Sequence, residues 1–405
     1  MTEHETHDAP SALPTLTKLG NTATGMAVIG AIALAAGYFT DHSEGHRVFA
    51  GAYHYGFIFW LTLTLGCTTL TFLHHTIRAQ WSLSILKVLE AGNKNLPLIG
   101  MFFIPIAIAT VAGHAVFPWA DPVFMAKLPI QKQQWLNPTA WLIRAVFYFV
   151  FWIWTTSKLN ASSKAQDLDR DEARAEWRRS FAPPLGVVHV ILLTFAFTDW
   201  LMSLNPMFFS TLYGAWHMAT GILMTIAFGT VLVLSMRTMR PFAAAINPAL
   251  TKDLGNMMLG FTMVFGYFTI SQFLIIWSGN LPEEIVFFVQ RFEGPLVFVG
   301  LAIVVFQFFG PFLALLSGKG KRTPHLLIIV AAWIFFFRTI DVWWQVVPFF
   351  KSASMVFSTL WIDLSALLFV GGVWMIFFVR NFKQAELLPL HDTRLQDTKL
   401  ALEAH

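Results

Sequence analysis

The sequence predicts an all-α, polytopic membrane protein with about ten transmembrane helices. The 405-residue chain is 56% apolar and only 12% charged, whereas soluble proteins carry about 25% charged residues. Apolar stretches of helical-span length recur throughout residues 22–379. Nearly all of the few ionisable residues inside these stretches lie at one depth. Length alone would suggest two or three soluble domains, but this composition indicates one membrane domain.

Ten apolar stretches are long enough to cross a bilayer as helices. Residues 1–21 form a polar N-terminal segment without a visible signal peptide, and residues 380–405 form a polar tail, expected to lie over the cytoplasmic face or a partner. The predicted spans are 22–39, 49–73, 96–117, 138–156, 183–203, 211–235, 255–277, 294–316, 324–345 and 358–379.

Basic residues in the connections predict the orientation. The connections after spans two, four, six and eight carry fifteen Lys and Arg residues, against five on the opposite face. By the positive-inside rule, the fifteen lie in the cytoplasm, as do both termini. The net charge of +4 therefore reflects the membrane topology and does not indicate nucleic-acid binding. The five basic residues of the outer connections are Arg47, Lys127, Lys132, Arg291 and Lys351.

Two cytoplasmic segments are expected to be helical. Residues 80–91 place Trp81, Ile85 and Leu89 at helical spacing, which predicts a short helix lying on the membrane surface. Residues 163–179 interleave acidic and basic residues, which predicts a solvated extension of the neighbouring spans.

A layer of ionisable residues occupies the outer third of the spans. A charge in hydrocarbon costs roughly 2.5–3.5 kcal/mol, so such residues are rare and usually functional. Eight of them at one level predict a proton pathway or a binding site. The eight are His54, His114, Arg144, Asp199, His217, Arg338, Asp341 and Asp363.

Pairing within this layer follows in part from spacing. Arg338 and Asp341 are three residues apart on one helix face, and Arg144 and Asp199 have similar depths. Asp363 remains without an obvious cation, so two arginines face three aspartates. We therefore expect a proton to be shared within the set. A purely structural role for the ion pairs is the alternative.

The histidines leave two alternatives open. An intramembrane histidine can serve as a hydrogen-bond donor between helices or as a titrating group. Haem b would need facing histidines, which His54 with His114 or His217 would supply at one depth only. His74 and His75 are expected at the interface. The single cysteine, Cys67, excludes an internal disulfide, an Fe–S cluster and c-type haem held by this chain alone.

The outer tryptophans are expected to form an interfacial belt, and only a cleft beside the polar layer would make them a platform for a quinone ring. This set comprises Trp119, Trp135, Trp200, Trp277, Trp343 and Trp344.

Two stretches resemble a known family. The residues 55–91, beginning Tyr-Gly-Phe-Ile-Phe-Trp, and the block 198–214, containing Asp-Trp-Leu-Met-Ser-Leu, resemble the polysulfide-reductase membrane-anchor (NrfD-like) family. The more specific likeness is to F-type subunits of alternative complex III, a bacterial quinol:cytochrome c oxidoreductase.

This resemblance implies two four-helix bundles, spans 49–203 and 211–345, with one further helix at each end. It implies no cofactor or metal in this chain, a homologous membrane subunit, and periplasmic Fe–S and haem c subunits.

The resemblance and the polar layer together predict an inner-membrane subunit that supports quinol oxidation and conducts protons. Asp199, His217, Arg338 and Asp341 are the first candidates for the pathway, and His54, His114, Arg144 and Asp363 follow. A quinone-binding residue is not identified. The alternatives are a stand-alone secondary transporter or proton channel, which predicts broken helices near the midplane, and a di-haem cytochrome b.

Overall fold

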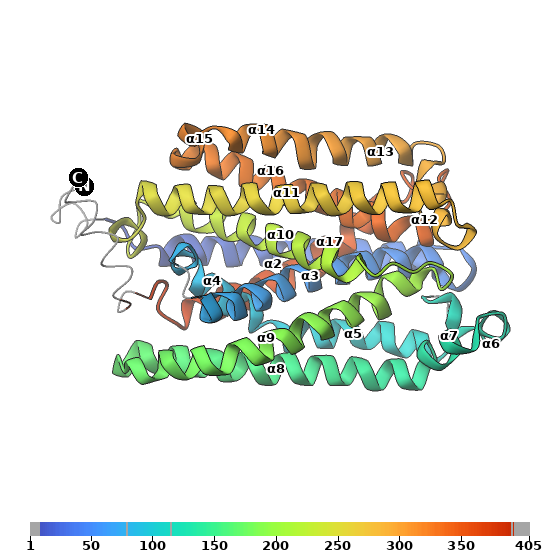
Figure 1. The fold of residues 1–405 in the computed structure, drawn as a ribbon, viewed down its shortest axis with the longest axis horizontal. Helices are drawn as coiled ribbons and strands as arrows, with labels where there is room; N and C mark the ends of the chain where they lie inside the picture. The colour runs from blue at the N-terminus through green and yellow to red at the C-terminus, as the bar shows by residue number, and fades with distance from the viewer. Residues whose placement is uncertain (1–8, 78–79, 114–115, 390–391, 393–405) are drawn as a thin grey trace.

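The computed structural model describes residues 9–77, 80–113, 116–389 and 392. Within these ranges the chain forms helices and no β-strand. Ten of these helices are long and apolar enough to cross a membrane. The prediction of an all-α polytopic membrane protein is therefore confirmed. Figure 1 shows the long helices running roughly along one axis, with the start of the first long helix and the end of the last one at the same end, called here the terminal end.

The membrane-spanning helices begin and end close to the predicted positions, apart from extensions at the terminal end of the molecule. Asn137 and Asn247 cap the starts of α8 and α11 by accepting hydrogen bonds from Ala140 and Leu250. The bounds are α2 Leu13–Thr40, α3 Arg47–Ile77, α5 Leu96–Val111, α8 Pro138–Asp169, α9 Glu172–Trp200, α10 Tyr213–Ser235, α11 Pro248–Gly279, α13 Leu296–Ala302 continued through the π-helical segment Ile303–Phe309 into α14 Gly310–Leu316, α16 Pro324–Val346, and α17 Leu360–Lys383.

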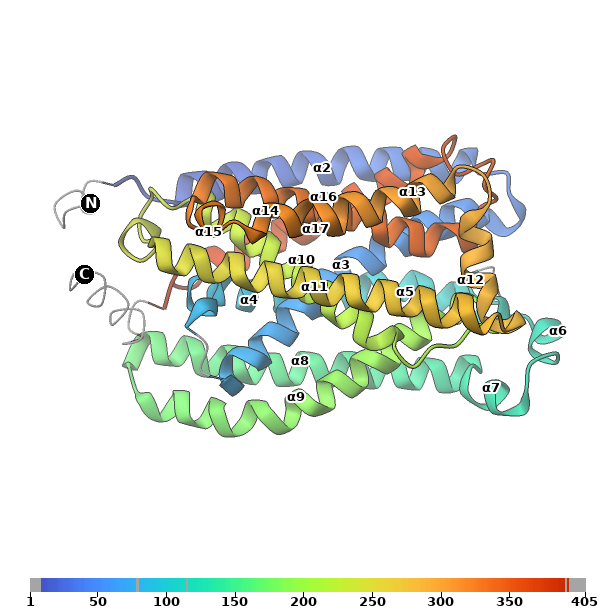
Figure 2. The same cartoon turned by 45° about the horizontal axis from the view of Figure 1, so that its top comes forward.

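Contacts between helices divide the core into two groups. In the first, α3 packs on α5 and α9, and α8 also packs on α5 and α9. In the second, α10 packs on α11 and α16, and α14 also packs on these two helices. The groups meet where α10 packs on α3 and α9. Figures 1 and 2 show α8 and α9 on one side of the molecule and α13–α16 on the other.

The first and last spans lie side by side. Contacts between α2 and α17 are the most extensive between any two helices of the described chain, and α17 also packs on α3. The chain before α2 is held as well, because Arg240 donates its backbone N–H to the Pro10 carbonyl at 2.8 Å and accepts from Ala12 at 3.1 Å.

The short helices gather at the two ends of the bundle. The helices α6 (Pro122–Met125), α7 (Ile130–Trp135) and α12 (Pro282–Phe292) lie at one end, called here the α12 end, whereas α4 (Leu86–Asn93) and α15 (Gly318–Arg322) lie nearer the terminal end (Figures 1 and 2). The described parts of the connections after spans two, four, six and eight lie at the terminal end (Figures 1 and 2).

The helix predicted on the membrane surface is instead inside the protein. Every residue of α4 is buried, and α4 packs against α3, α8 and α17. Lys87 is buried because its ammonium group contacts Asp167 at 2.6 Å, Glu90 at 3.2 Å and the Ser163 hydroxyl at 3.0 Å. The segment is helical, as its apolar spacing predicts, but the polar face of α4 contacts protein rather than water.

Residues 163–179 extend α8 and α9 as predicted, with a turn between them. The ion pair there joins Arg174 to Asp169 at 2.6 Å. Asp171 caps the start of α9 by accepting from the Ala173 N–H.

A close approach of α3 and α10 gives the first prediction. A Cβ atom at Gly66 would collide with the Thr225 hydroxyl and the Gly221 carbonyl, whereas one at the exposed Gly260 would meet no atom within 4 Å. Gly66→Ala should therefore destabilise the protein by about 1–3 kcal/mol. Gly260→Ala, in a helix interior, should leave it unchanged or more stable by about 1 kcal/mol. Thermal unfolding of both variants in one detergent checks this, and equal midpoints would contradict the packing.

Candidate functional site

The α12 end holds the described members of the predicted polar layer. Asp199 and Asp341 lie near the ends of α9 and α16, and His54, His217 and Asp363 lie near the starts of α3, α10 and α17. These helix ends come together at the α12 end (Figure 1). His114 lies outside the described residues. The layer is not one hydrogen-bonded cluster as the sequence suggested, because the described side chains divide into three separate groups.

The first group surrounds Asp199, whose side chain is 0% exposed. Arg144 binds both carboxylate oxygens, with Nε 2.8 Å from Oδ2 and Nη2 2.9 Å from Oδ1. Tyr148, one turn along α8, donates to Oδ2 at 2.9 Å, and Trp135 of α7 donates to Oδ1 at 2.9 Å. The carboxylate therefore accepts four hydrogen bonds, two of them in the bidentate geometry that favours Arg.

The end of α9 beside Asp199 is closed by side chains. The Asp199 carbonyl accepts from Trp141 at 3.1 Å and from Ser203 at 2.6 Å, and the Trp200 carbonyl lies 2.7 Å from His54 Nε2. Terminal carbonyls of a helix have no partner within the helix, so a buried end needs such donors. His54 thus serves as a hydrogen-bond donor between helices, which is the structural alternative foreseen for an intramembrane histidine.

A cavity of about 410 Å³ lies next to this group. Trp135, Thr198 and Ser203 contribute to its wall, together with Phe195 and Phe208. In the Arg144–Asp199 ion pair, Arg144 lies nearer to solvent, with 18% of its side chain exposed. Its guanidinium stacks on the Trp135 ring, 4.1 Å from the ring centre. Trp135 therefore separates the cavity from the buried carboxylate.

The second group joins α10 to α16. Arg338 forms a buried ion pair with Asp341 Oδ2, as the three-residue spacing predicted, and Gln345 donates to Asp341 Oδ1 at 3.0 Å. His217 Nε2 lies 2.7 Å from Gln345 Oε1, and His217 Nδ1 lies 2.8 Å from the Tyr213 carbonyl. Gln345, which sequence reasoning missed, connects the histidine to the carboxylate. Its position four residues after Asp341 on α16 was the available signal.

The third group corrects the expectation that Asp363 has no cation. Lys351 Nζ lies 2.6 Å from Asp363 Oδ1, and Trp343 donates to Oδ2 at 2.9 Å. Neither charged side chain is exposed. Lys351 had been assigned to an outer connection, but that connection folds back onto the start of α17. Burial lowers the pKa of Lys351, and the attraction of Asp363 opposes this shift. Three aspartates thus face three cations, which removes the charge excess inferred from the sequence.

Arg291 is a further buried cation that sequence reasoning placed in a loop. It lies on α12 with no exposed surface and donates to the carbonyls of Trp344, Gln345 and Phe287 at 3.1, 2.6 and 2.6 Å. Burial lowers the pKa of Arg291 to about 9. Two of these acceptors are in the last turn of α16, so Arg291 caps this helix and fixes α12 against the second group.

Most of the predicted tryptophan belt is inside the protein. Trp119, Trp200, Trp343 and Trp344 are buried, whereas Trp277 is 49% exposed. The buried indoles pack within the bundle or donate to the groups described above, which explains why amphipathic residues near a predicted interface do not face lipid.

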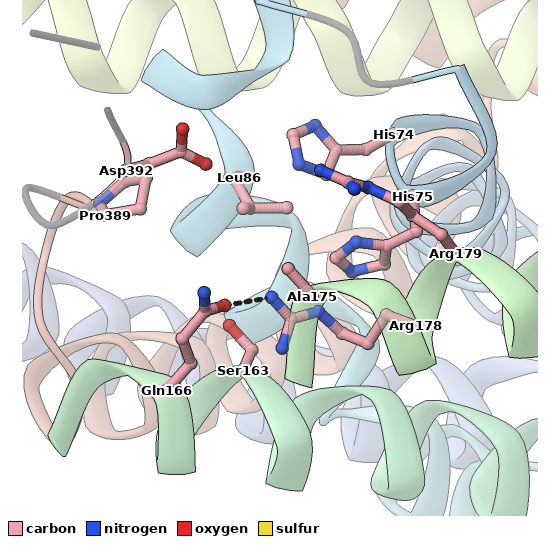
Figure 3. A pocket seen from close by; sticks show the side chains of 10 residues that line it. All are labelled: His74, His75, Leu86, Ser163, Gln166, Ala175, Arg178, Arg179, Pro389 and Asp392. Carbon is pink, nitrogen blue, oxygen red and sulfur yellow. Dashed lines mark hydrogen bonds between the residues drawn. The ribbon is translucent and has the colours of Figure 1, made fainter. Parts of the chain in front are cut away.

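A second polar region lies at the terminal end. His74 and His75 are buried rather than interfacial, and they line a small cavity of about 30 Å³ with Arg178 and Gln166. Figure 3 shows these side chains from α3, α8 and α9, with Arg178 hydrogen-bonded to Gln166. A volume of this size holds about one water molecule.

The Lys351–Asp363 pair gives the second prediction. Lys351→Met leaves a buried carboxylate without its cation and should cost about 3–5 kcal/mol of unfolding free energy. The double variant Lys351→Met/Asp363→Leu removes both charges and should recover most of this loss. Thermal unfolding of the purified chain measures both. A single variant as stable as the parent, or a double variant less stable than the single one, would contradict a buried pair.

Comparison with known proteins adds no relative. No protein-family model matches the chain, and no curated protein is significantly similar to it. Among the described residues, no three His, Cys, Asp or Glu side chains come together as metal ligands.

Proposed function

We propose that this chain is an integral membrane subunit of a bacterial respiratory quinol:cytochrome c oxidoreductase, in which it supports quinol oxidation and conducts protons. The proposal combines the NrfD-like sequence blocks with the chemistry of the α12 end. The observation that carries it is the concentration of buried carboxylates, histidines and cations at the α12 end of the bundle.

The Asp-Trp-Leu-Met-Ser-Leu block, the most specific part of the resemblance, supports this reading because it lies within the candidate site. Its aspartate is Asp199, bound to Arg144 and Tyr148, and its serine is Ser203, which donates to the Asp199 carbonyl. The residues that carry the resemblance are thus the residues that build the first group.

The cavity beside Trp135 offers a place where protons or a quinol headgroup can meet the first group. Its wall combines apolar and aromatic residues with an equal number of polar ones, Lys132 and Ser210 among them. A flat aromatic ring bearing two hydroxyl groups suits such a wall. Asp199 would then be the group that takes up and releases the proton, while Arg144 stays charged and lines the partly exposed edge of the path.

In this proposal the α12 end faces the periplasm, and both termini are cytoplasmic in the inner membrane. Electrons leave quinol toward Fe–S and haem c subunits on the periplasmic side, with a homologous membrane subunit beside this chain. This placement puts the buried groups next to the side on which quinol protons are released. It agrees with the excess of basic residues at the terminal end.

The third prediction tests the proton role in the assembled complex. Asp199→Asn and Asp341→Asn remove an ionisable group while preserving shape, and each should lower quinol oxidation or proton release on the order of a hundredfold, the usual size of a lost proton-transfer group. Glu176→Gln, at an exposed position on the terminal end of α9, is the control and should match the parent. Stopped-flow quinol oxidation with a pH indicator gives both quantities.

Assembly must be equal for this comparison, so the haem content of each purified complex is measured alongside. Unchanged turnover and proton yield in both aspartate variants would reject proton conduction through these groups. The same result would leave a scaffold role for the buried ion pairs.

A further inference from the structure

The second group contains more hydrogen-bond contacts than its neutral components can satisfy. Three contacts run in series: the Tyr213 carbonyl to His217 Nδ1 at 2.8 Å, His217 Nε2 to Gln345 Oε1 at 2.7 Å, and Gln345 Nε2 to Asp341 Oδ1 at 3.0 Å. Each of these contacts needs a hydrogen between its two heavy atoms. A neutral imidazole supplies one, and the amide supplies one more from its nitrogen end. One hydrogen is therefore missing.

Rotating the amide does not remove the deficit. In the arrangement with Gln345 Nε2 toward Asp341, a neutral His217 can satisfy either the Tyr213 carbonyl or Gln345 Oε1, but not both. With the amide turned, its nitrogen donates to His217 and its oxygen faces Asp341, so two oxygen acceptors meet unless the carboxyl carries a proton. Each neutral choice leaves two acceptors within about 3 Å of each other in a buried site, where an unsatisfied polar contact is costly.

We infer that His217 and Asp341 share one additional proton across Gln345. In one arrangement His217 is an imidazolium, its Nε2–H donates to Gln345 Oε1, and Asp341 is a carboxylate. In the other, the Gln345 amide is turned, His217 is neutral, and Asp341 donates its carboxyl proton to Gln345 Oε1. Conversion moves one proton from His217 Nε2 to Asp341 Oδ1, with no electron transferred and the same total charge.

Arg338, Arg291 and Tyr213 are the charged and titratable residues around the pair, and the Arg338 charge opposes the imidazolium arrangement. Asp341 Oδ2 accepts from Arg338, which holds the carboxyl in place in either form. Arg291 of α12 donates to the Gln345 carbonyl and fixes the backbone of the relay residue without touching its amide. From α9, Phe197 stacks on the His217 ring with centroids 4.8 Å apart and adds no hydrogen-bonding group. From α10, Tyr213 contributes its carbonyl, and its ring lies 4.3 Å from that of His217.

Gln345 is thus a positioning residue that passes a proton between two titratable side chains. This inference deepens the proposed function and rests on it for its physiological role. A discontinuous proton path requires a stored proton, and this one lies beside Arg338. The second group is separate from the Arg144–Asp199 group, so it acts as a store rather than as the entry point at the cavity.

The experiment reads protonation in the isolated full-length chain rather than turnover, so that this inference and the proposed function can fail separately. The chain, purified without a histidine tag and labelled with ¹⁵N-histidine, is placed in lipid bilayers at about pH 8, where ordinary histidines with a pKa of about 6.5 are neutral. Nitrogen NMR then reports any imidazolium among the 13 histidines. Infrared absorption reports any protonated carboxylic acid.

The wild-type chain should show an imidazolium signal that His217→Gln removes, or an acid band that Asp341→Asn removes, or both, with a sum of one proton. Gln345→Leu should abolish the signal at this pH, because it removes the shared hydrogen bonds. Gln272→Leu is the matched control: Gln272 is also buried, but it accepts from Ser210 outside this group, so the signal should persist.

A wild-type chain with only neutral histidines and no protonated acid would overturn the inference without any variant. A signal that survives Gln345→Leu would overturn the relay role of Gln345. A shared proton whose loss leaves quinol turnover unchanged in the complex would reject a role for this proton in the proposed function and leave the inference itself standing.

Discussion

Neutralisation of buried charge governs the α12 end of this protein. Asp199, Asp341 and Asp363 lie in helices whose surroundings are largely aromatic and aliphatic, where an isolated carboxylate would cost several kcal/mol or more. Each has a cation within hydrogen-bonding distance: Arg144, Arg338 and Lys351. The positions of α8 and of the connection before α17 therefore depend on the Arg144 and Lys351 pairs, because moving either element would leave a charge unpaired. The third pair lies within α16 and neutralises charge inside one helix.

Closure of helix ends is the second constraint at the same level. The helices α9 and α16 both finish inside the protein, and donors from other elements satisfy their last carbonyls: His54, Trp141 and Ser203 on α9, and Arg291 on α16. These donors lock the helices that present Asp199 and Asp341. A rigid frame of this kind favours proton transfer over short distances, because donors and acceptors stay aligned while a proton moves between them.

The sequence predicted the spans, the level of the polar groups and the Arg338–Asp341 and Arg144–Asp199 pairs, because span length, helical spacing and depth are local properties. It did not predict partners brought by folding of connections. Lys351 and Arg291 looked like loop charges, yet the chain returns them to the core. The α4 segment looked like a surface helix, since nothing local shows that Asp167 and Ser163 cover Lys87. The sequence did not indicate Gln345, because the role of an amide follows only from the two groups that it contacts, here His217 and Asp341.

The central claim is that this bundle works beside periplasmic electron carriers and not alone. Purification of the native, chromosomally tagged chain in a mild detergent, followed by a visible spectrum and subunit identification, tests it most directly. The account predicts co-purification of a homologous membrane subunit with Fe–S and haem c subunits, and therefore c-type haem absorption in the preparation. A colourless, monomeric chain that carries protons or a solute in liposomes would contradict it.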